Sequence, residues 1–424
     1  MEYQPNQIKE GITLHLIPND RFKTNLMAIF ITTTLTRENV TKNALIPAVL
    51  RRGSKHMPTQ EEISKVLEEM YGATFDCGVD KRGDNQVLKF YFESINDRFL
   101  PQEQETLLKT SVDKFLELVF DPLTEKDNQF KPEYVNQEKD NLKKIIEGKI
   151  DNKAKYAMDR CIEEMYKDEP FGLYRYGYLE DLESIDAANL YEAYQQLLTK
   201  SKIDIFVSGI EEPKLQEWIT QNPKVQELSA RKPQFVAITG KPKEAPVPEK
   251  VVQESMEVTQ GKLIIGLDLA IEDSNLRYDA TIYNSILGGS ANSKLFQKVR
   301  EEASLAYSAS SSYVKNKNNI FISCGIDIPN YEQTVDIIKK QLEAMKQGDF
   351  TDEEVENAKQ GILSAIKSIE DEQDTEMMYY FAQELTDQKY SLEEYSRKIS
   401  EVTKQKVIDI AQKVTIDTIY FLKD

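Results

Sequence analysis

The chain has 424 residues, 40% of them hydrophobic and 30% charged, which is enough for two domains that each bury a core. Its formal net charge of −18 argues against a nucleic-acid or anionic-membrane partner, because phosphate-rich surfaces attract basic proteins. The sequence has no N-terminal signal pattern, no run of about 18 apolar residues and only three widely spaced cysteines, so we expect a cytoplasmic protein with free thiols.

The first half predicts strands, a hairpin and a long helix in that order. Met27–Ile31 is an apolar run typical of a buried strand. A polar turn at Lys81–Asn85 separates two further strands, and its Gly, Asp and Asn residues supply the backbone angles that a hairpin needs. Phe130–Val135 opens an amphipathic helix, and Ile203–Val207 closes this half as another strand.

A break in this pattern covers residues 223–250. Its prolines stand among Lys, Glu and Gln with little hydrophobic periodicity, which favours an extended connector. We therefore predict an N-terminal domain at 1–222, a linker at 223–250 and a C-terminal domain at 251–424. The prolines are Pro223, Pro233, Pro242, Pro246 and Pro248.

The second half repeats the order of elements of the first half. Leu263–Leu267 is an apolar strand, and a polar turn at Lys315–Asn319 lies between two strands. Phe350–Val355 echoes Phe130–Val135 at the start of a long helix, and Thr418–Phe421 is a closing strand. Two halves that share one order of elements indicate an internal repeat, and hairpins mixed with long helices predict an α+β fold.

Histidine and cysteine offer no evident catalytic centre. His15 and His56 are too far apart to form a pair of ligands on one helix, and no His-x-x-Glu-His or His-Glu-x-x-His motif occurs. We interpret His56 as a surface turn residue and His15 as lying on the polar face of a half-buried strand. Cys77 and Cys324 fall in apolar strands, where a small buried thiol is the usual explanation.

One segment, Ser293–Ser308, suggests a binding function. It predicts a helix that ends near Ala303 and continues directly into a strand, with Arg300 at the helix end and Tyr307 at the strand start. A short link between the two elements lets both side chains converge on one point. A guanidinium and a phenol both donate hydrogen bonds and suit a carbonyl or a developing oxyanion. The alternative is that Arg300 pairs with a surface glutamate.

With these residues in view, the chain resembles the M16 family of zinc metallopeptidases, the group of pitrilysin and mitochondrial processing peptidase, over nearly its whole length. The resemblance implies two homologous α+β domains of the M16/LuxS-like metallohydrolase type, each an antiparallel-rich sheet covered by helices, joined by a linker. Members carry His-x-x-Glu-His in the first domain. The matching positions here are Ala44, Pro47 and Ala48, which lack every group needed to bind zinc or activate water.

The resemblance places the third zinc ligand in the helix Glu138–Glu147, near Lys143 and Lys144, where cations replace it. It therefore implies that this chain binds no metal and has no catalytic residue of its own. The second-domain signature is kept, because members carry an Arg and, seven residues later, a Tyr in a Leu-Ala-Tyr-Ser context, as Arg300 and Tyr307 do. In heterodimeric members one subunit holds the zinc and the other supplies this pair.

The resemblance thus implies a non-catalytic subunit with no independent activity, which pairs with a zinc-bearing M16 subunit and acts on short peptides or a peptide precursor. Zinc is then expected in the partner. Two alternatives remain: a non-enzymatic scaffold or peptide-binding pseudo-peptidase that forms a homodimer, and an autonomous peptidase that uses other residues.

Overall fold

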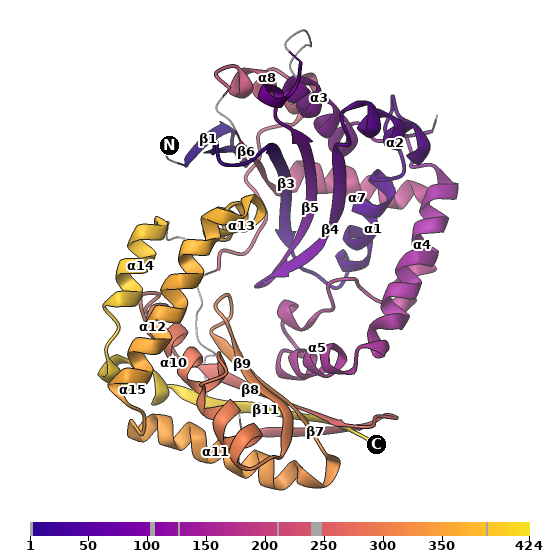
Figure 1. The fold of residues 1–424 in the computed structure, drawn as a ribbon. Helices are drawn as coiled ribbons and strands as arrows, with labels where there is room; N and C mark the ends of the chain where they lie inside the picture. Colours follow the sequence, from indigo (N-terminus) through magenta and orange to yellow (C-terminus); the bar gives the residue numbers. More distant parts are fainter. Residues whose placement is uncertain (1–2, 102–106, 126–127, 210–211, 239–247, 387–388) are drawn as a thin grey trace. The chain divides into compact units, whose positions relative to one another are not determined.

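The computed structural model describes residues 3–101, 107–125, 128–209, 212–238, 248–386 and 389–424 (Figure 1). Its contacts form two compact units, each with one β-sheet covered by helices, which confirms the predicted α+β class. Within these residues, no helix is long and apolar enough to cross a membrane. Unit 1 comprises residues up to Glu147, Leu173–Val236 and Glu372–Phe381, and unit 2 comprises Gly148–Gly172, Ala237–Asp371 and Ala382–Asp424.

The sheet of unit 1 has six strands in the order β1-β2-β6-β3-β5-β4. All neighbouring pairs are antiparallel except β2 with β6, so the sheet is antiparallel-rich as expected. The predicted turn joins β4 to β5, with Gly83 at a φ of 57°. The strands are β1 Gln4–Lys9, β2 Ile12–Pro18, β3 Thr24–Thr34, β4 Thr74–Arg82, β5 Asn85–Ile95 and β6 Lys202–Gly209.

Helices cover one face of this sheet with a continuous apolar core. Ile29 and Ile31 of β3 and Phe90 of β5 pack there against side chains of α1, α3, α4 and α7. A capping box between Thr59 and Glu62 fixes the start of α2, because each side chain bonds a backbone amide of the other residue. The helices are α1 Val40–Leu50, α2 Gln60–Glu69, α3 Leu107–Phe120, α4 Pro132–Glu147, α6 Leu179–Leu182, α7 Ala187–Lys200, α8 Leu215–Thr220 and α9 Pro223–Glu227.

The other face of this sheet is buried too, which the sequence did not predict. Phe381 of α13 (Gln373–Glu384) stacks on Phe30 of β3 with ring centroids 4.1 Å apart. The prediction of a half-exposed His15 is therefore wrong: this side chain is fully buried, stacks on Phe206, and has its Nε2 2.9 Å from Asp204 Oδ1. The polar face of β2 is an interior face because residues far along the chain cover it.

The sheet of unit 2 has five strands in the order β7-β11-β8-β10-β9. Its pairs are antiparallel except β7 with β11. The predicted second hairpin is β9–β10, with Asn318 at a φ of 51° in its turn. The strands are β7 Lys250–Ser255, β8 Gly261–Leu269, β9 Ala306–Val314, β10 Asn319–Ile326 and β11 Val414–Lys423.

Helices of unit 2 cover one face of that sheet. Leu263, Ile265 and Leu267 of β8 pack into this core. A capping box of Thr351 with Glu354 starts α12. The segment before β9, expected to be an ordinary helix, is a π-helical stretch, Phe296–Glu302. The α-helices are α10 Leu276–Gly288, α11 Tyr331–Gln347, α12 Asp352–Lys367, α14 Leu392–Ser400 and α15 Lys404–Ala411.

The second face of the unit 2 sheet is covered by α5 (Lys153–Met165), a helix from the first half of the sequence (Figure 1). Ala157, Cys161 and Met165 of α5 form a buried cluster with Ile264 of β8 and Phe321 of β10. Gly266 of β8 permits this approach, because a Cβ there would lie 2.8 Å from Met165 Sδ. Each half thus continues from its long helix, α4 or α12, through a short 3₁₀ segment into a helix that belongs to the other unit.

The compact units therefore differ from the predicted domains 1–222 and 251–424. The expected linker is also partly packed: Pro223–Glu227 forms α9, and the amides of Arg231 and Gln234 donate to the carbonyls of Glu10 and Lys200 in unit 1. Pro242 and Pro246 lie outside the described residues. The packing of α5, α13 and residues 223–234 brings together residues that are far apart in the sequence, and a pattern of local composition does not predict such contacts.

The covering of the unit 1 sheet by α13 gives a stability prediction. Phe381→Ala removes a fully buried ring and should lower the free energy of unfolding of unit 1 by about 3–5 kcal/mol. Trp218, the single tryptophan, lies in unit 1, so its fluorescence during urea unfolding reports the change. Phe99→Ala, at a ring that is 45% exposed, is the matched control and should cost about 0.5 kcal/mol or less. Equal losses would contradict the covering role of α13.

A second prediction concerns acid stability in unit 2. The Glu254 carboxylate accepts hydrogen bonds from Tyr156 (2.5 Å), Tyr420 (2.8 Å) and Arg160 (3.0 Å). Burial acts to raise its pKa, but these bonds outweigh burial and hold the pKa below its usual 4.5. The ionised Glu254 carboxylate therefore adds to the free energy of unfolding above the pKa of the unfolded state, and this stability is lost as the pH falls through the folded-state pKa.

Thermal unfolding from about pH 7 to pH 3 tests this sign. The unchanged protein should have a higher midpoint than Glu254→Gln at neutral pH, and the difference should shrink as the pH falls below the unfolded pKa. Tyr420→Phe, which removes one of the donors, should show a smaller difference of the same sign. A difference between the unchanged protein and Glu254→Gln that stays constant across this range would exclude the proposed linkage.

Candidate functional site

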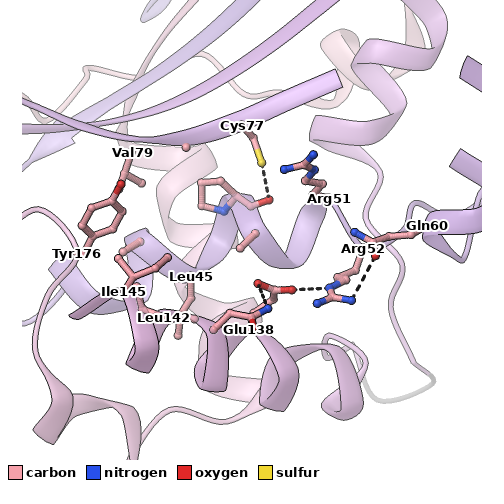
Figure 2. A pocket seen from close by; sticks show the side chains of 15 residues that line it. Leu45, Arg51, Arg52, Gln60, Cys77, Val79, Glu138, Leu142, Ile145 and Tyr176 are labelled. Atoms are coloured by element: carbon pink, nitrogen blue, oxygen red, sulfur yellow. Dashed lines mark hydrogen bonds and ion pairs between the residues drawn. The ribbon is translucent and has the colours of Figure 1, made fainter. Parts of the chain in front are cut away.

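A cavity of about 350 Å³ lies in unit 1 between α1, α4 and β4 (Figure 2). The helix α1 supplies one wall, α4 supplies the facing wall, and the edge strand β4 borders both. The lining residues are Ala44, Leu45, Pro47, Ala48, Arg51, Arg52, Gln60, Cys77, Gly78, Val79, Glu138, Asn141, Leu142, Ile145 and Tyr176.

The three positions matched to the zinc motif all line this cavity. Ala44, Pro47 and Ala48 are spaced by three and four residues, so one face of α1 presents them together. None of the three side chains has an atom that could bind a metal or accept a proton. The carbonyl oxygen of Pro47 accepts a hydrogen bond from the Cys77 thiol at 3.2 Å.

Cys77 is not suited to nucleophilic chemistry. Burial raises the pKa of its thiol to about 12, although the nearby Arg51 opposes that effect. The thiol is therefore neutral at physiological pH, whereas a reactive cysteine requires a thiolate. Cys161 and Cys324 are buried, and burial raises each thiol pKa to about 12 as well. The interpretation of Cys77 and Cys324 as packing residues agrees with these environments.

The carboxylate in the cavity, that of Glu138, is paired with an arginine. Glu138 is 8% exposed, and its Oε1 accepts a short hydrogen bond from Arg52 Nε. Asn141 donates to its other oxygen at 3.2 Å, and Arg52 Nη1 donates to Gln60 at 3.3 Å (Figure 2). Because a buried carboxylate is costly unless it is paired, Arg52 is the group that makes Glu138 tolerable in this wall.

These residues do not fit a zinc ion. Cys77 and Glu138 are the two lining side chains able to ligate one, and protein zinc sites use three or four ligands. The Cys77 thiol is held in its neutral form and the Glu138 carboxylate is paired with Arg52, so neither is available to bind a metal ion. The charge balance of the cavity favours an anion over a cation.

The resemblance places the third zinc ligand near Lys143 and Lys144, but neither lysine is among the residues that line the cavity. Both lysines are exposed and lie outside the cavity. The α4 side chains that face α1 follow the helical spacing from Glu138 through Asn141 and Leu142 to Ile145. That spacing identifies the inward face of α4 once one residue on it, here Glu138, is known to be buried.

Arg300 and Tyr307 lie in unit 2, on either side of the link from the π-helical stretch to β9. The Arg300 side chain is 43% exposed, its guanidinium lies 4.5 Å from the ring of Phe296, and its Nε is 3.6 Å from Glu301 Oε1. Tyr307 is 85% exposed. It lies at a β-bulge, because Ala306 pairs with Ile326 and Ser308 with Gly325. Bulges redirect side chains and are frequent beside functional sites.

His56 is a surface residue as predicted, with its side chain 64% exposed and 3.4 Å from Glu117. His15 contributes to the covered face of the unit 1 sheet and does not line the cavity.

Comparison with known proteins identifies the family. A family model described as the Peptidase M16 inactive domain matches residues 184–362. The probable inactive metalloprotease YmfF of Bacillus subtilis (strain 168) is 34% identical over 423 residues, which cover 99% of this chain and 98% of that protein. The uncharacterized zinc protease YmxG of the same organism is 26% identical over 225 residues, about half of each chain.

A solved structure has the same fold. The crystal structure of a conserved protein from Enterococcus faecalis V583 superposes with a TM-score of 0.89 at 29% identity and covers 100% of this chain and 99% of that one. The predicted family is therefore confirmed. The chain belongs to the M16 peptidase family and is a homologue of those members that are named inactive.

Proposed function

We propose that this chain is a catalytically incomplete M16 subunit that pairs with a zinc-bearing M16 subunit and supplies Arg300 and Tyr307 to a peptide bound there. The supporting observation is a contrast within one chain. The cavity beside α1 lacks the three ligands that a protein zinc site needs, whereas Arg300 and Tyr307 in unit 2 both have exposed polar groups. Such a chain has the means to hold a substrate but none to activate water.

The chemistry divides between the two subunits. The partner's zinc would supply an activated water and polarise the scissile carbonyl. The guanidinium of Arg300 and the phenol of Tyr307 would donate hydrogen bonds to the carbonyl oxygen as it gains negative charge. An 85% exposed phenol on a bulge is free to approach a ligand, since no burial has to be reversed.

The relatives support the existence of a suitable partner. Bacillus subtilis has both the homologue named a probable inactive metalloprotease and the relative named a zinc protease. A relative named inactive and a relative named a zinc protease are thus present in one organism, as pairing requires.

A non-enzymatic scaffold, or a peptide-binding pseudo-peptidase that forms a homodimer, is the second candidate. One observation favours it: Arg300 lies over Phe296 and beside Glu301, so contacts within its own segment account for this arginine without a substrate. The two candidates differ in whether Arg300 and Tyr307 affect turnover by another subunit.

Peptide hydrolysis by mixed subunits tests the proposal. The purified chain is combined with the zinc-motif M16 relative from the same cell, and turnover of a set of short peptides is compared with that of each chain alone. Activity should appear only in the mixture. Arg300→Ala and Tyr307→Phe should each lower kcat by about 100-fold, as loss of one oxyanion donor does, with the complex still formed.

Arg397→Ala is the matched control, because Arg397 is an exposed arginine of unit 2 that pairs with a glutamate as Arg300 does. It should leave turnover unchanged. If the Arg300→Ala, Tyr307→Phe double variant supports full activity, the role in trans is excluded and the scaffold is favoured. Stoichiometric zinc in the purified chain alone, with hydrolysis of peptides, would instead favour an autonomous peptidase.

A further inference from the structure

The cavity beside α1 has two chemically different ends. One end carries Arg51, Arg52 and Gln60, and the other is lined by Leu45, Leu142, Ile145 and Val79 with the ring of Tyr176 (Figure 2). A pocket with a cationic end and an apolar end fits a ligand that has an anionic group attached to a hydrophobic one.

The apolar end is open to a ligand. Leu45 and Leu142 are buried in its floor, whereas Ile145 is 46% exposed at its margin. An exposed isoleucine beside a buried leucine on α4 leaves apolar surface in contact with water, and an apolar side chain placed there would remove that surface from water. The volume of about 350 Å³ is near the lower end for small-ligand pockets, which suits one or two residues of a peptide.

The polar end has a net positive charge. Its two guanidiniums face one carboxylate, Glu138, and that carboxylate is engaged by Arg52. This leaves the charge of Arg51 unbalanced by the lining residues. Arg51 is 52% exposed, and its partner Asp76 lies outside the cavity lining at 3.6 Å, with a side chain that is 74% exposed. Such an exposed pair is weak, so a carboxylate ligand could replace Asp76 at little cost.

The groups between the two ends suit a peptide bond. The amide of Asn141 and the carboxylate of Glu138, which lie between Arg52 and Leu142, line the cavity with both donors and acceptors. The last residue of a peptide that ends in an apolar residue carries three groups on one Cα: the amide of the preceding peptide bond, an apolar side chain and a carboxylate. A simple apolar acid shares the last two features and lacks the first.

We propose that this cavity binds the C-terminal carboxylate of a peptide whose last side chain is apolar, with Arg51 as the anion-binding residue and Ile145 in contact with the side chain. This site lies within unit 1 and requires neither a partner subunit nor Arg300 and Tyr307. It goes beyond the proposed function and stands or falls independently of it.

Calorimetric titration of the purified chain with N-acetyl-glycyl-leucine tests the inference. The free acid should bind saturably. The same compound with a C-terminal amide should bind at least about tenfold more weakly, because a hydrogen bond to a charged group is lost. Arg51→Gln should weaken binding of the acid by a similar factor and abolish its preference over the amide. Ile145→Asp should weaken the binding of both the acid and the amide.

Lys143→Gln is the matched control, because it removes one positive charge from the exposed side of the same α4 helix that lines the cavity. It should leave binding unchanged, and circular dichroism checks that each variant is folded. Equal binding of acid and amide, equal effects of Arg51→Gln and Lys143→Gln, or no binding at millimolar concentrations would overturn the proposal. If 4-methylpentanoate binds as tightly as the acylated dipeptide, the assignment to a peptide is overturned.

Discussion

Both sheets of this protein are apolar on both faces, and this constraint determines how the chain is organised. In β3, Ile29 and Ile31 face one layer of helices, while Phe30 faces the opposite direction and is equally buried. A strand of this kind must be covered twice, because an exposed apolar face would remain in contact with water. The helices adjacent in sequence cover one face only. Helices α13 and α5 provide the second cover, each on the sheet whose strands come mainly from the other half of the sequence.

This constraint explains which parts of the fold the sequence predicted. Local features depend on residues within a few positions of one another, so a sequence pattern can predict them. The hairpins β4–β5 and β9–β10 are of this kind, as are the capped starts of α2 and α12. The burial of His15 depends on α13, more than 350 positions away in the sequence, and alternation along β2 carries no information about it. The compact units differ from the predicted domains for the same reason, since α5 follows α4 without any break in composition.

For the candidate site too, the sequence predicted some positions and missed others. Matching the chain to a family motif predicted that Ala44, Pro47 and Ala48 belong together, and they share one wall of a cavity. The match did not fix the facing positions on α4, where a choice of one or two residues turns a side chain away from α1. Lys143 and Lys144 are on the outer side, and the cavity receives Glu138 and Ile145 instead. A helical face has to be counted from a residue known to point inward, and the sequence alone did not provide that residue.

The two arginines at the end of α1 differ in a way that sequence adjacency conceals. Arg52 is largely buried and its charge is used to neutralise Glu138, whose burial would otherwise destabilise unit 1. Removing either member of that pair would leave an unpaired charge, so Arg52 is held in place by stability. Arg51 is not required in this way, because the side chain of its partner Asp76 is exposed and the pair is therefore weak. Of the two positive charges that line the cavity, only that of Arg51 can bind a ligand without cost to the fold. A test of binding there is therefore a test of function and not of folding.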